Sequence, residues 1–264
     1  MKTAFCVYGI PTPLIRPGDD LAGILIEAAE RSCGLEDGDI VVIAESALAT
    51  AEGRVIRLEA VIPSERALAL AAEYAMDPRV VEVVLRESDA IVGGIPGFLL
   101  SMKNGTLLPN AGVDASNAPP GTVIPLPVDP DGSAIAMRQA IMSRCGVSVG
   151  VVVADSRTHA MRLGCSGVAI GCAGFGAVSD ERGRCDLFGR ELEVTRCALA
   201  DNIASAAELV FGEADESIPL AVVRGLGIPL SEVAGIEEID ASECLFMGVA
   251  LNRDPSLLDK ERKS

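Results

Sequence analysis

A chain of 264 residues with 49% hydrophobic and 23% charged residues can bury a core, which excludes an intrinsically disordered protein. A net charge of −16 with only four lysines excludes a nucleic-acid-binding face of clustered basic residues. No apolar run approaches the roughly 20 residues of a transmembrane helix, and the start is too short for a signal peptide. We therefore expect a cytoplasmic protein with no membrane partner.

The chain opens with a β-α-β pattern. Residues 4–10 have the composition of a strand, and Asp19 or Asp20 is placed to cap a helix that stops near Gly34. The apolar run in 39–44 predicts the second strand.

Two helices and a hairpin are expected next. One helix starts at Ser64 and runs to about Tyr74, and another starts at Asp77, with proline at its first helical position. Residues 98–108 predict a hairpin that turns at Asn104-Gly105, a sequence typical of tight hairpin turns.

The second half of the chain starts with a helix that Ser133 caps and that ends near Gly146. A strand over 147–154 then delivers Asp155 at its end, where a buried strand would reach the surface. A carboxylate in this position is a candidate for chemistry at the edge of a sheet.

Small residues dominate 164–176, which predicts strands in close contact or backbone close to a ligand. A long helix over about 194–211 and a strand over 218–224 follow. Helices and strands mix without a regular βα period, which favours an α+β fold of mixed sheets with flanking helices. We expect a single unit over 1–264, with a crossing between two lobes near 93–130 if lobes form.

Three short segments set small or turn-forming residues around a carboxylate, beside a predicted strand: 110–117, 128–133 and 154–156. Aspartates on such loops hold hard cations facing a phosphate, which points to phosphate chemistry. A protein that handles phosphate with so few lysines needs cations. The alternatives are that these aspartates only stabilise turns and that the acidity only serves solubility.

Other phosphate, metal and redox motifs are missing. No P-loop is present, and 171–176 has the wrong glycine spacing for a dinucleotide fingerprint. Eight cysteines form no Cys-x-x-Cys pair and only one histidine exists, so an ordinary zinc site is not expected. We interpret the cysteines as mostly buried apolar residues and His159 as structural, and we assign no role to Arg54 or Arg190.

Seven motifs together resemble the coenzyme F420-0:γ-glutamyl ligase family of archaea, and the resemblance runs from about residue 8 to 226. Any one motif alone would be weak, whereas seven in order are specific. The motifs are Pro13-Leu-Ile-x-x-Gly18-Asp-Asp, Ala51-Glu-Gly-Arg54, Pro63-Ser-Glu-Arg66, Asn110-Ala-Gly-Val-Asp-Ala-Ser-Asn117, Asp129-Pro-Asp-Gly-Ser133, Asp186-Leu-Phe-Gly-Arg-Glu-Leu192 and Ile218-Pro-Leu-Ala-Val-Val-Arg-Gly225.

The resemblance implies a GTP-dependent ligase that adds L-glutamate to coenzyme F420-0 through an acyl phosphate. It implies a homodimer with an α+β fold and a divalent metal, Mg²⁺ or Mn²⁺, and it allows a monovalent cation as well. The metal would neutralise charge on the transferred phosphoryl group and align donor with acceptor.

By position, the resemblance implies that Asp114 and Asp155 hold a first metal ion and that Ser156 with Glu213 holds a second. It also implies a nucleotide site, whose residues come from four parts of the chain: Thr12, Pro13, Leu14, Ile15, Ser46, Asn117, Phe211, Gly212, Ala214, Asp215, Glu216, Ser217 and Ile218.

Two departures from the family pattern keep other functions open. Thr50 stands where the family has a nucleotide-binding lysine, and Glu45 replaces one of two adjacent hydroxyl residues. Residues 157–164 lack part of the basic stretch that the family shows after Asp155. One alternative is a divergent paralogue that ligates another carboxylate with metal; the other is a non-catalytic homologue that binds a nucleotide or partner.

Overall fold

The computed structural model describes residues 4–253, and two compact units divide the chain. Unit 1 comprises Met1–Glu52 and Pro127–Glu237. Unit 2 comprises Gly53–Leu126 and Glu238–Ser264. Each unit has a sheet and a hydrophobic core of its own.

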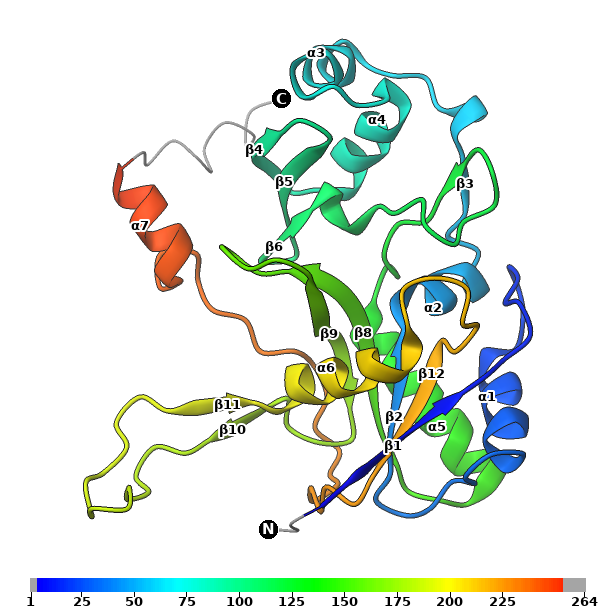
Figure 1. The fold of residues 1–264 in the computed structure, drawn as a ribbon, viewed down its shortest axis with the longest axis vertical. Coiled ribbons are helices and arrows are strands. Elements are labelled where there is room, and N and C mark those ends of the chain that lie inside the picture. The colour runs from blue at the N-terminus through cyan, green and yellow to red at the C-terminus, as the bar shows by residue number, and fades with distance from the viewer. Residues whose placement is uncertain (1–3, 254–264) are drawn as a thin grey trace. The chain divides into compact units, whose positions relative to one another are not determined.

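Unit 1 is built on a mixed five-stranded sheet with the order β1-β12-β2-β8-β9 (Figure 1). β1, β2 and β8 run parallel to one another, whereas β12 and β9 run antiparallel to their neighbours. The carboxyl ends of three parallel strands therefore meet at one end of the sheet, where open α/β sheets bind ligands. The strands are β1 (Cys6–Ile10), β12 (Leu220–Arg224), β2 (Ile40–Ala44), β8 (Gly150–Thr158) and β9 (Cys165–Ala173).

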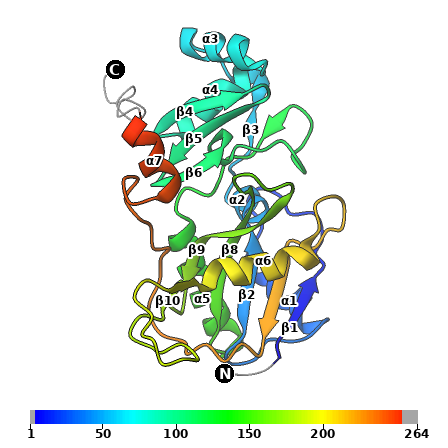
Figure 2. The same cartoon turned by 60° about the vertical axis from the view of Figure 1, so that its left-hand side comes forward.

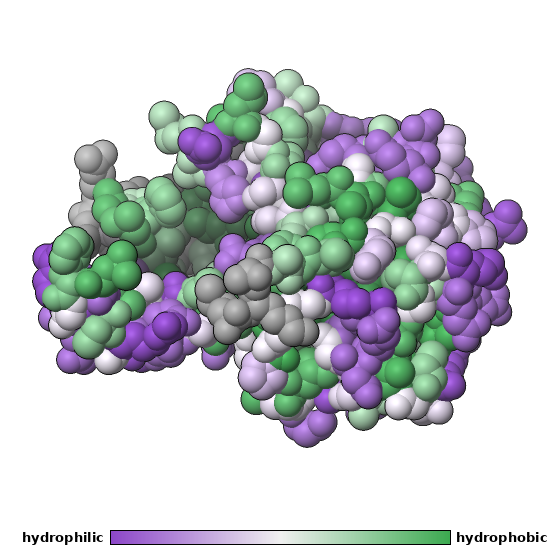
Figure 3. Space-filling view, turned by 60° about the horizontal axis from the view of Figure 1, so that its bottom comes forward, coloured by the Kyte–Doolittle hydropathy of each residue, from purple (hydrophilic) through white to green (hydrophobic). Residues whose placement is uncertain are grey.

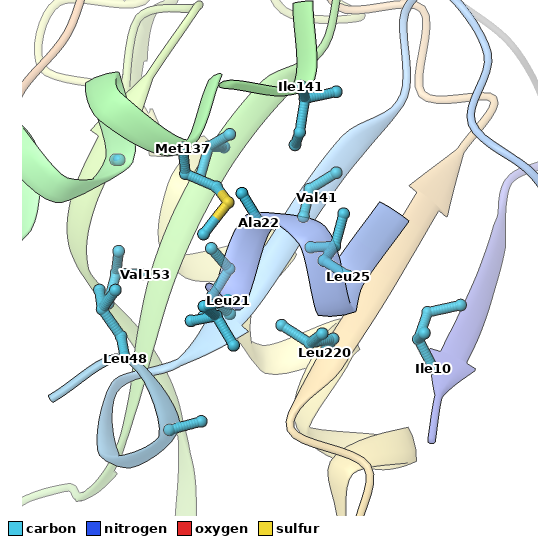
Figure 4. Packing of buried hydrophobic residues seen from close by; sticks show 14 of the residues in the cluster. Ile10, Leu21, Ala22, Leu25, Val41, Leu48, Met137, Ile141, Val153 and Leu220 are labelled. Atoms are coloured by element: carbon cyan, nitrogen blue, oxygen red, sulfur yellow. The ribbon is translucent and has the colours of Figure 1, made fainter. Parts of the chain in front are cut away.

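Helices cover both faces of this sheet because its strands are apolar on both sides. Val41 of β2 belongs to the cluster with α1 and α5, and its neighbour Val42 belongs to the cluster with α6. Figure 4 shows α1 and α5 side chains around Val41, and Figure 2 shows α6 crossing the other face. The helices of unit 1 are α1 (Leu21–Glu30), α2 (Glu45–Ala51), α5 (Pro130–Cys145) and α6 (Leu199–Phe211).

Glycines in β9 let both helix layers approach the sheet closely, so the close contacts of the small-residue stretch are with helices and not, as predicted, with strands or a ligand. A Cβ on Gly167 would lie 2.4 Å from the carbonyl oxygen of Ala204 in α6. A Cβ on Gly171 would lie 2.4 Å from the carbonyl oxygen of Pro130 in α5.

The expectation that a strand ends before Asp155 is wrong. β8 continues through Asp155 to Thr158, because β9 pairs with it over this whole length, from Asp155 opposite Val168 to Thr158 opposite Cys165. The apolar run ends at residue 154, but the hydrogen-bond ladder does not.

The predicted helix that Ser133 caps starts earlier than expected. Asp129 is the cap, since its side chain accepts a hydrogen bond from the Gly132 N–H at 2.9 Å, and Pro130 takes the first helical position. Ser133 lies inside the first turn and donates a hydrogen bond to Glu52. At the chain's first helix, Asp20 is confirmed as the cap.

The predicted helix over 194–211 starts at Leu199, because the preceding residues pair in a ribbon. β10 (Val178–Asp180) and β11 (Arg196–Ala198) form this two-stranded arm, the left-hand projection of Figure 3. Leu187 and Phe188, between these strands, are 100% and 84% exposed, so they belong to no core within the described chain.

Unit 2 contains a three-stranded antiparallel sheet, a short two-stranded ribbon and three helices within the described residues. The predicted hairpin turn is confirmed: Asn104 and Gly105 have φ of 48° and 73°. Its elements are β4 (Ala90–Ile95), β5 (Phe98–Lys103), β6 (Thr106–Pro109), β3 (Ile56–Arg57), β7 (Thr122–Val123), α3 (Glu65–Tyr74), α4 (Pro78–Glu87), α7 (Leu245–Arg253) and two 3₁₀ helices (Leu58–Ala60, Asn110–Gly112).

The α+β class with mixed sheets is confirmed, and the homodimer stays a prediction. Between residues 4 and 253, no helix has both the length and the apolar character needed to cross a membrane.

Candidate functional site

β8 carries the site residues of unit 1 past the end of β2. Ala44, the last residue of β2, pairs with Ala154, so Asp155 is the first residue beyond that pairing. Side chains alternate along a strand, so Asp155 and Arg157 share the face that α2 covers, whereas Ser156 faces α6. β8 therefore carries charged side chains, Asp155 and Arg157, on one face and the Ser156 hydroxyl on the other.

A buried ion pair occupies the α2 face. The Nε–H of Arg157 donates a hydrogen bond of 2.6 Å to Oδ2 of Asp155, and both side chains are about nine-tenths buried. Burying two charges is costly, so the pair has to be close and hydrogen-bonded to persist. A cation-binding role for Asp155 would have to coexist with this arginine.

Carboxylates gather on the α6 face. Ser156 donates a hydrogen bond to Oε1 of Glu213 at 3.2 Å, so the structure brings these two predicted residues together. Glu208, half-buried on α6, lies against both of them. Burial, and then the hydrogen bond and charge of Glu213, raise the pKa of Glu208 to about 7.

Sequence reasoning missed Glu208. A signal exists: Glu208 follows the buried residues Ala204 and Ala207 at helical spacing and precedes buried Phe211, so a carboxylate borders the buried face of α6. Charged residues at such positions are uncommon unless they have a partner.

Two predicted nucleotide segments, distant in the chain, are joined by hydrogen bonds. The Thr12 N–H donates to the Ser217 carbonyl at 3.0 Å, and the Ser217 hydroxyl donates to the Thr12 carbonyl at 3.2 Å. Ser217 adopts a left-handed conformation, with φ of 56°, and Ala214 N–H donates to the Glu216 carboxylate. The loops 12–15 and 211–218 thus form one structure.

Helix α2 lies at the same end of the sheet. It starts directly after β2, and its half-buried residues include Ser46 and Thr50. The loop after β1 reaches it, since Gly18 N–H donates to the Ala51 carbonyl, and Pro219 accepts a hydrogen bond from Ala44 N–H. Within unit 1, the predicted contacts of three chain regions therefore collect where the parallel strands end.

In unit 2, Asp114 and Asn117 lie on an exposed loop with an unusual backbone. Asn110, Ala111 and Gly112 are left-handed in succession, with φ of 51°, 52° and 71°, and Asn117 has φ of 52°. Left-handed alanine costs roughly 1–2 kcal/mol, so the surrounding structure must impose this path.

Two contacts fix the loop in unit 2. The Asn110 side chain accepts a hydrogen bond from Leu99 N–H at 2.9 Å. Gly112 packs closely on Leu126, since a Cβ added at this glycine would lie 2.4 Å from the leucine side chain. The Asp114 carboxylate accepts hydrogen bonds from Ala115 N–H, Ser116 N–H and the Ser116 hydroxyl. Turn stabilisation is thus a visible role of Asp114, and its convergence with Asp155 on one cation stays a prediction.

Over residues 4–253, no group of three or more His, Cys, Asp and Glu side chains is arranged to hold a metal ion. The metal roles of Asp114, Asp155, Ser156 and Glu213 stay predictions. Arg54 and Arg190, to which no role was assigned, have protein partners: Arg54 donates to Glu87 and to the Leu126 carbonyl, and Arg190 pairs with Asp186. His159, interpreted as structural, forms a hydrogen bond with Ser166.

Comparison with known proteins identifies related chains over most of the length. Residues 9–225 match the family model described as F420-0:Gamma-glutamyl ligase. A coenzyme F420:L-glutamate ligase of Methanopyrus kandleri is 48% identical over 85% of this chain and 89% of that protein. Proteins of the same name from Archaeoglobus fulgidus and Methanothermobacter thermautotrophicus are 42% and 43% identical, over 90% and 81% of this chain and 93% and 85% of their own lengths.

Proposed function

The chain belongs to the F420-0:gamma-glutamyl ligase family and is an amide-bond-forming ligase, and from this premise we propose that it joins L-glutamate to coenzyme F420-0 using GTP. The γ-phosphoryl group of GTP passes to the terminal carboxylate of the acceptor, and GDP leaves. The glutamate amine then attacks the acyl carbon, loses a proton and displaces phosphate. The related coenzyme F420:L-glutamate ligases support L-glutamate and a coenzyme F420 acceptor, and the description of the family supports F420-0.

The observation that carries this proposal is the gathering of the loops 12–15 and 211–218 with α2 at the carboxyl ends of β1, β2 and β8. Backbone N–H groups of such loops suit a nucleotide, because they donate hydrogen bonds without requiring lysine. Their mutual hydrogen bonds hold the loops in place before a ligand arrives, which reduces the entropy lost on binding.

The oxygen donors present fit a divalent cation such as Mg²⁺ or Mn²⁺. On the α6 face, Ser156 and Glu213 are joined by a hydrogen bond and offer the hydroxyl and carboxylate oxygens that hard cations prefer. Asp155 offers a carboxylate on the other face of β8. Bound there, a cation supplies charge neutralisation for phosphoryl transfer. The proposal includes a homodimer, a cytoplasmic location and room for a monovalent cation, all of which rest on the sequence.

The test is an assay with coenzyme F420-0, L-glutamate, GTP and Mn²⁺, in which mass spectrometry detects the glutamyl product and chromatography detects GDP. We expect one GDP for each amide formed. Glu213→Gln and Asp155→Asn should both reduce the rate, and an exposed control, Glu27→Gln, should not. GTP binding without product would refute the proposal.

Glu45 and Thr50 favour a non-catalytic homologue that binds a nucleotide or partner, and a second candidate enzyme is a ligase that acts on a different carboxylate. Both residues lie on α2 beside the predicted nucleotide contact Ser46. GDP release with another phospho-carboxylate acceptor, but not with F420-0, would support this candidate. A non-catalytic homologue would release no GDP with any acceptor.

A further inference from the structure

The loop 110–117 of unit 2 needs support from outside itself. Asn110, Ala111 and Asn117 have left-handed φ although none of them is glycine. Such conformations persist only where the surrounding structure imposes them, and they concentrate at functional sites. The side chains of 114–117 are exposed above this strained backbone. The contacts that hold the loop therefore bear on function.

The buried segment 123–126 holds one side of the loop. Asp114 N–H donates a hydrogen bond to the Ile124 carbonyl at 3.0 Å, and Ile124 N–H donates to the Asp114 carbonyl at 2.8 Å. The Leu126 side chain packs so closely on Gly112 that a Cβ there would clash with it. A shift of this segment would therefore carry the Asp114 loop with it.

Arg54 bonds to the end of this segment. Its Nε–H donates a hydrogen bond to the Leu126 carbonyl at 3.2 Å, from a side chain that is largely buried. β7 ends at Val123, so this carbonyl lies beyond the strand, and a side chain fixes it. Leu126 thus joins Arg54 to the loop, because its carbonyl meets the arginine and its side chain meets Gly112.

The other end of the guanidinium is held by Glu87, the last residue of α4. Oε2 of Glu87 accepts hydrogen bonds from Nη2 of Arg54 at 2.8 Å and from Nζ of Lys103, the last residue of β5, at 2.6 Å. Burial acts to raise the pKa of Glu87, but the hydrogen bonds and charges of Lys103 and Arg54 lower it below its usual value. Glu87 therefore stays ionised and fixes the guanidinium, whose planar fork aims Nε at Leu126.

We propose that Arg54 is a positioning residue, which holds the loop 110–117 in its strained path through Leu126 and so sets where the Asp114 carboxylate lies. The inference rests on the proposed function, because the loop acts in ligation only if the chain uses a metal and a nucleotide. A lysine presents one nitrogen, whereas a guanidinium bonds two acceptors in fixed directions. Arginine therefore suits a position that ties Glu87 to Leu126.

The first measurement is amide hydrogen exchange in the metal-free full chain, followed by NMR. Arg54→Met keeps the apolar stem of the side chain, and Lys103 still pairs with Glu87 in this variant. Exchange of the Asp114 and Ile124 N–H groups should become about tenfold to a hundredfold faster, the range of one charged hydrogen bond. Exchange in the middle of α4 should stay as it is, which shows that unit 2 remains folded.

Arg79→Met is the matched control. Arg79 is also an arginine of unit 2 paired with a carboxylate, but the bonds of its guanidinium run to Asp77, two residues away, so they act locally. This variant should leave exchange in the loop unchanged. Adding Glu87→Gln to Arg54→Met should cause little further change, since both residues act in one chain of contacts.

The second measurement is the Mn²⁺ dependence of the ligase rate. Arg54→Met should raise the Mn²⁺ concentration that gives the half-maximal rate about tenfold or more, as does the loss of a residue that orients a metal ligand. The rate at saturating Mn²⁺ should change much less. An enzyme that is merely destabilised would instead lose maximal rate at an unchanged midpoint. Arg79→Met should match the unsubstituted chain in both quantities.

Arg54→Lys covers a failure of Arg54→Met to fold, because it keeps the charge beside Glu87 and loses the fork. It should shift both readouts in the same direction by a smaller amount. Unchanged exchange in every folded Arg54 variant would overturn the anchoring, and faster exchange with an unchanged Mn²⁺ midpoint would overturn its link to the site. An unsubstituted chain that forms no product overturns the proposed function instead, and the exchange rates then decide whether Arg54 positions the loop.

Discussion

Glu208→Gln should make the protein more stable at pH 8 and leave its stability at pH 5 almost unchanged. Burial and the neighbouring Glu213 raise the pKa of Glu208 from 4.5 to about 7. Between these values the native state binds more protons than the unfolded chain, so the free energy of unfolding falls as pH rises through this window. Glutamine resembles the protonated acid and removes the cost of the charge.

The size of the effect follows from the two pKa values. The full interval would be worth about 3 kcal/mol, at about 1.4 kcal/mol per pKa unit. Glu208 is only half-buried, so solvent screening reduces this to about 1–2 kcal/mol. For a chain of this size, we expect the unfolding midpoint to rise by about 3–6 °C at pH 8.

Scanning calorimetry from pH 5 to 8.5, with a chelator present, measures this difference. Glu27→Gln, an exposed helix position on α1, is the matched control and should change stability by less than about 0.5 kcal/mol at either pH. A gain of equal size at pH 5 and pH 8 would show that packing, not charge burial, is responsible. No gain at pH 8 would refute the raised pKa.

Other predictions concern backbone, capping and thiol chemistry. Gly112→Ala should lower the free energy of unfolding in guanidinium by about 2–4 kcal/mol, because it adds a steric clash to a left-handed φ. Gly121 also has a left-handed φ, of 77°, but open space around it, so Gly121→Ala should lower this free energy by only about 1 kcal/mol. Equal losses in the two variants would contradict the clash. Asp129→Ala should cost about 1 kcal/mol, and unchanged stability would refute its capping role. Burial raises the pKa of Cys172 to about 12, so iodoacetamide at pH 8 should label exposed Cys165 but not native Cys172, as peptide mass spectrometry can check.

Local sequence determined the parts of the fold whose energetics are local. The cap at Asp20 and the turn at Asn104-Gly105 depend on a side chain and a backbone only a few residues apart, so both could be predicted. The apolar run in 39–44 likewise predicted a strand, which is β2. The ordered motifs indicated the family, which the comparisons confirm.

Tertiary structure decided the features that depend on distant partners. β8 runs past its apolar stretch because β9 pairs with it, which places Asp155 inside a strand next to Arg157. Glu208 joins Ser156 and Glu213 only because α6 crosses that face of the sheet, and burial there sets its pKa. Strand pairing and desolvation arise between segments far apart in the chain, so residue type and spacing predicted candidate side chains, and the fold determined which of them meet.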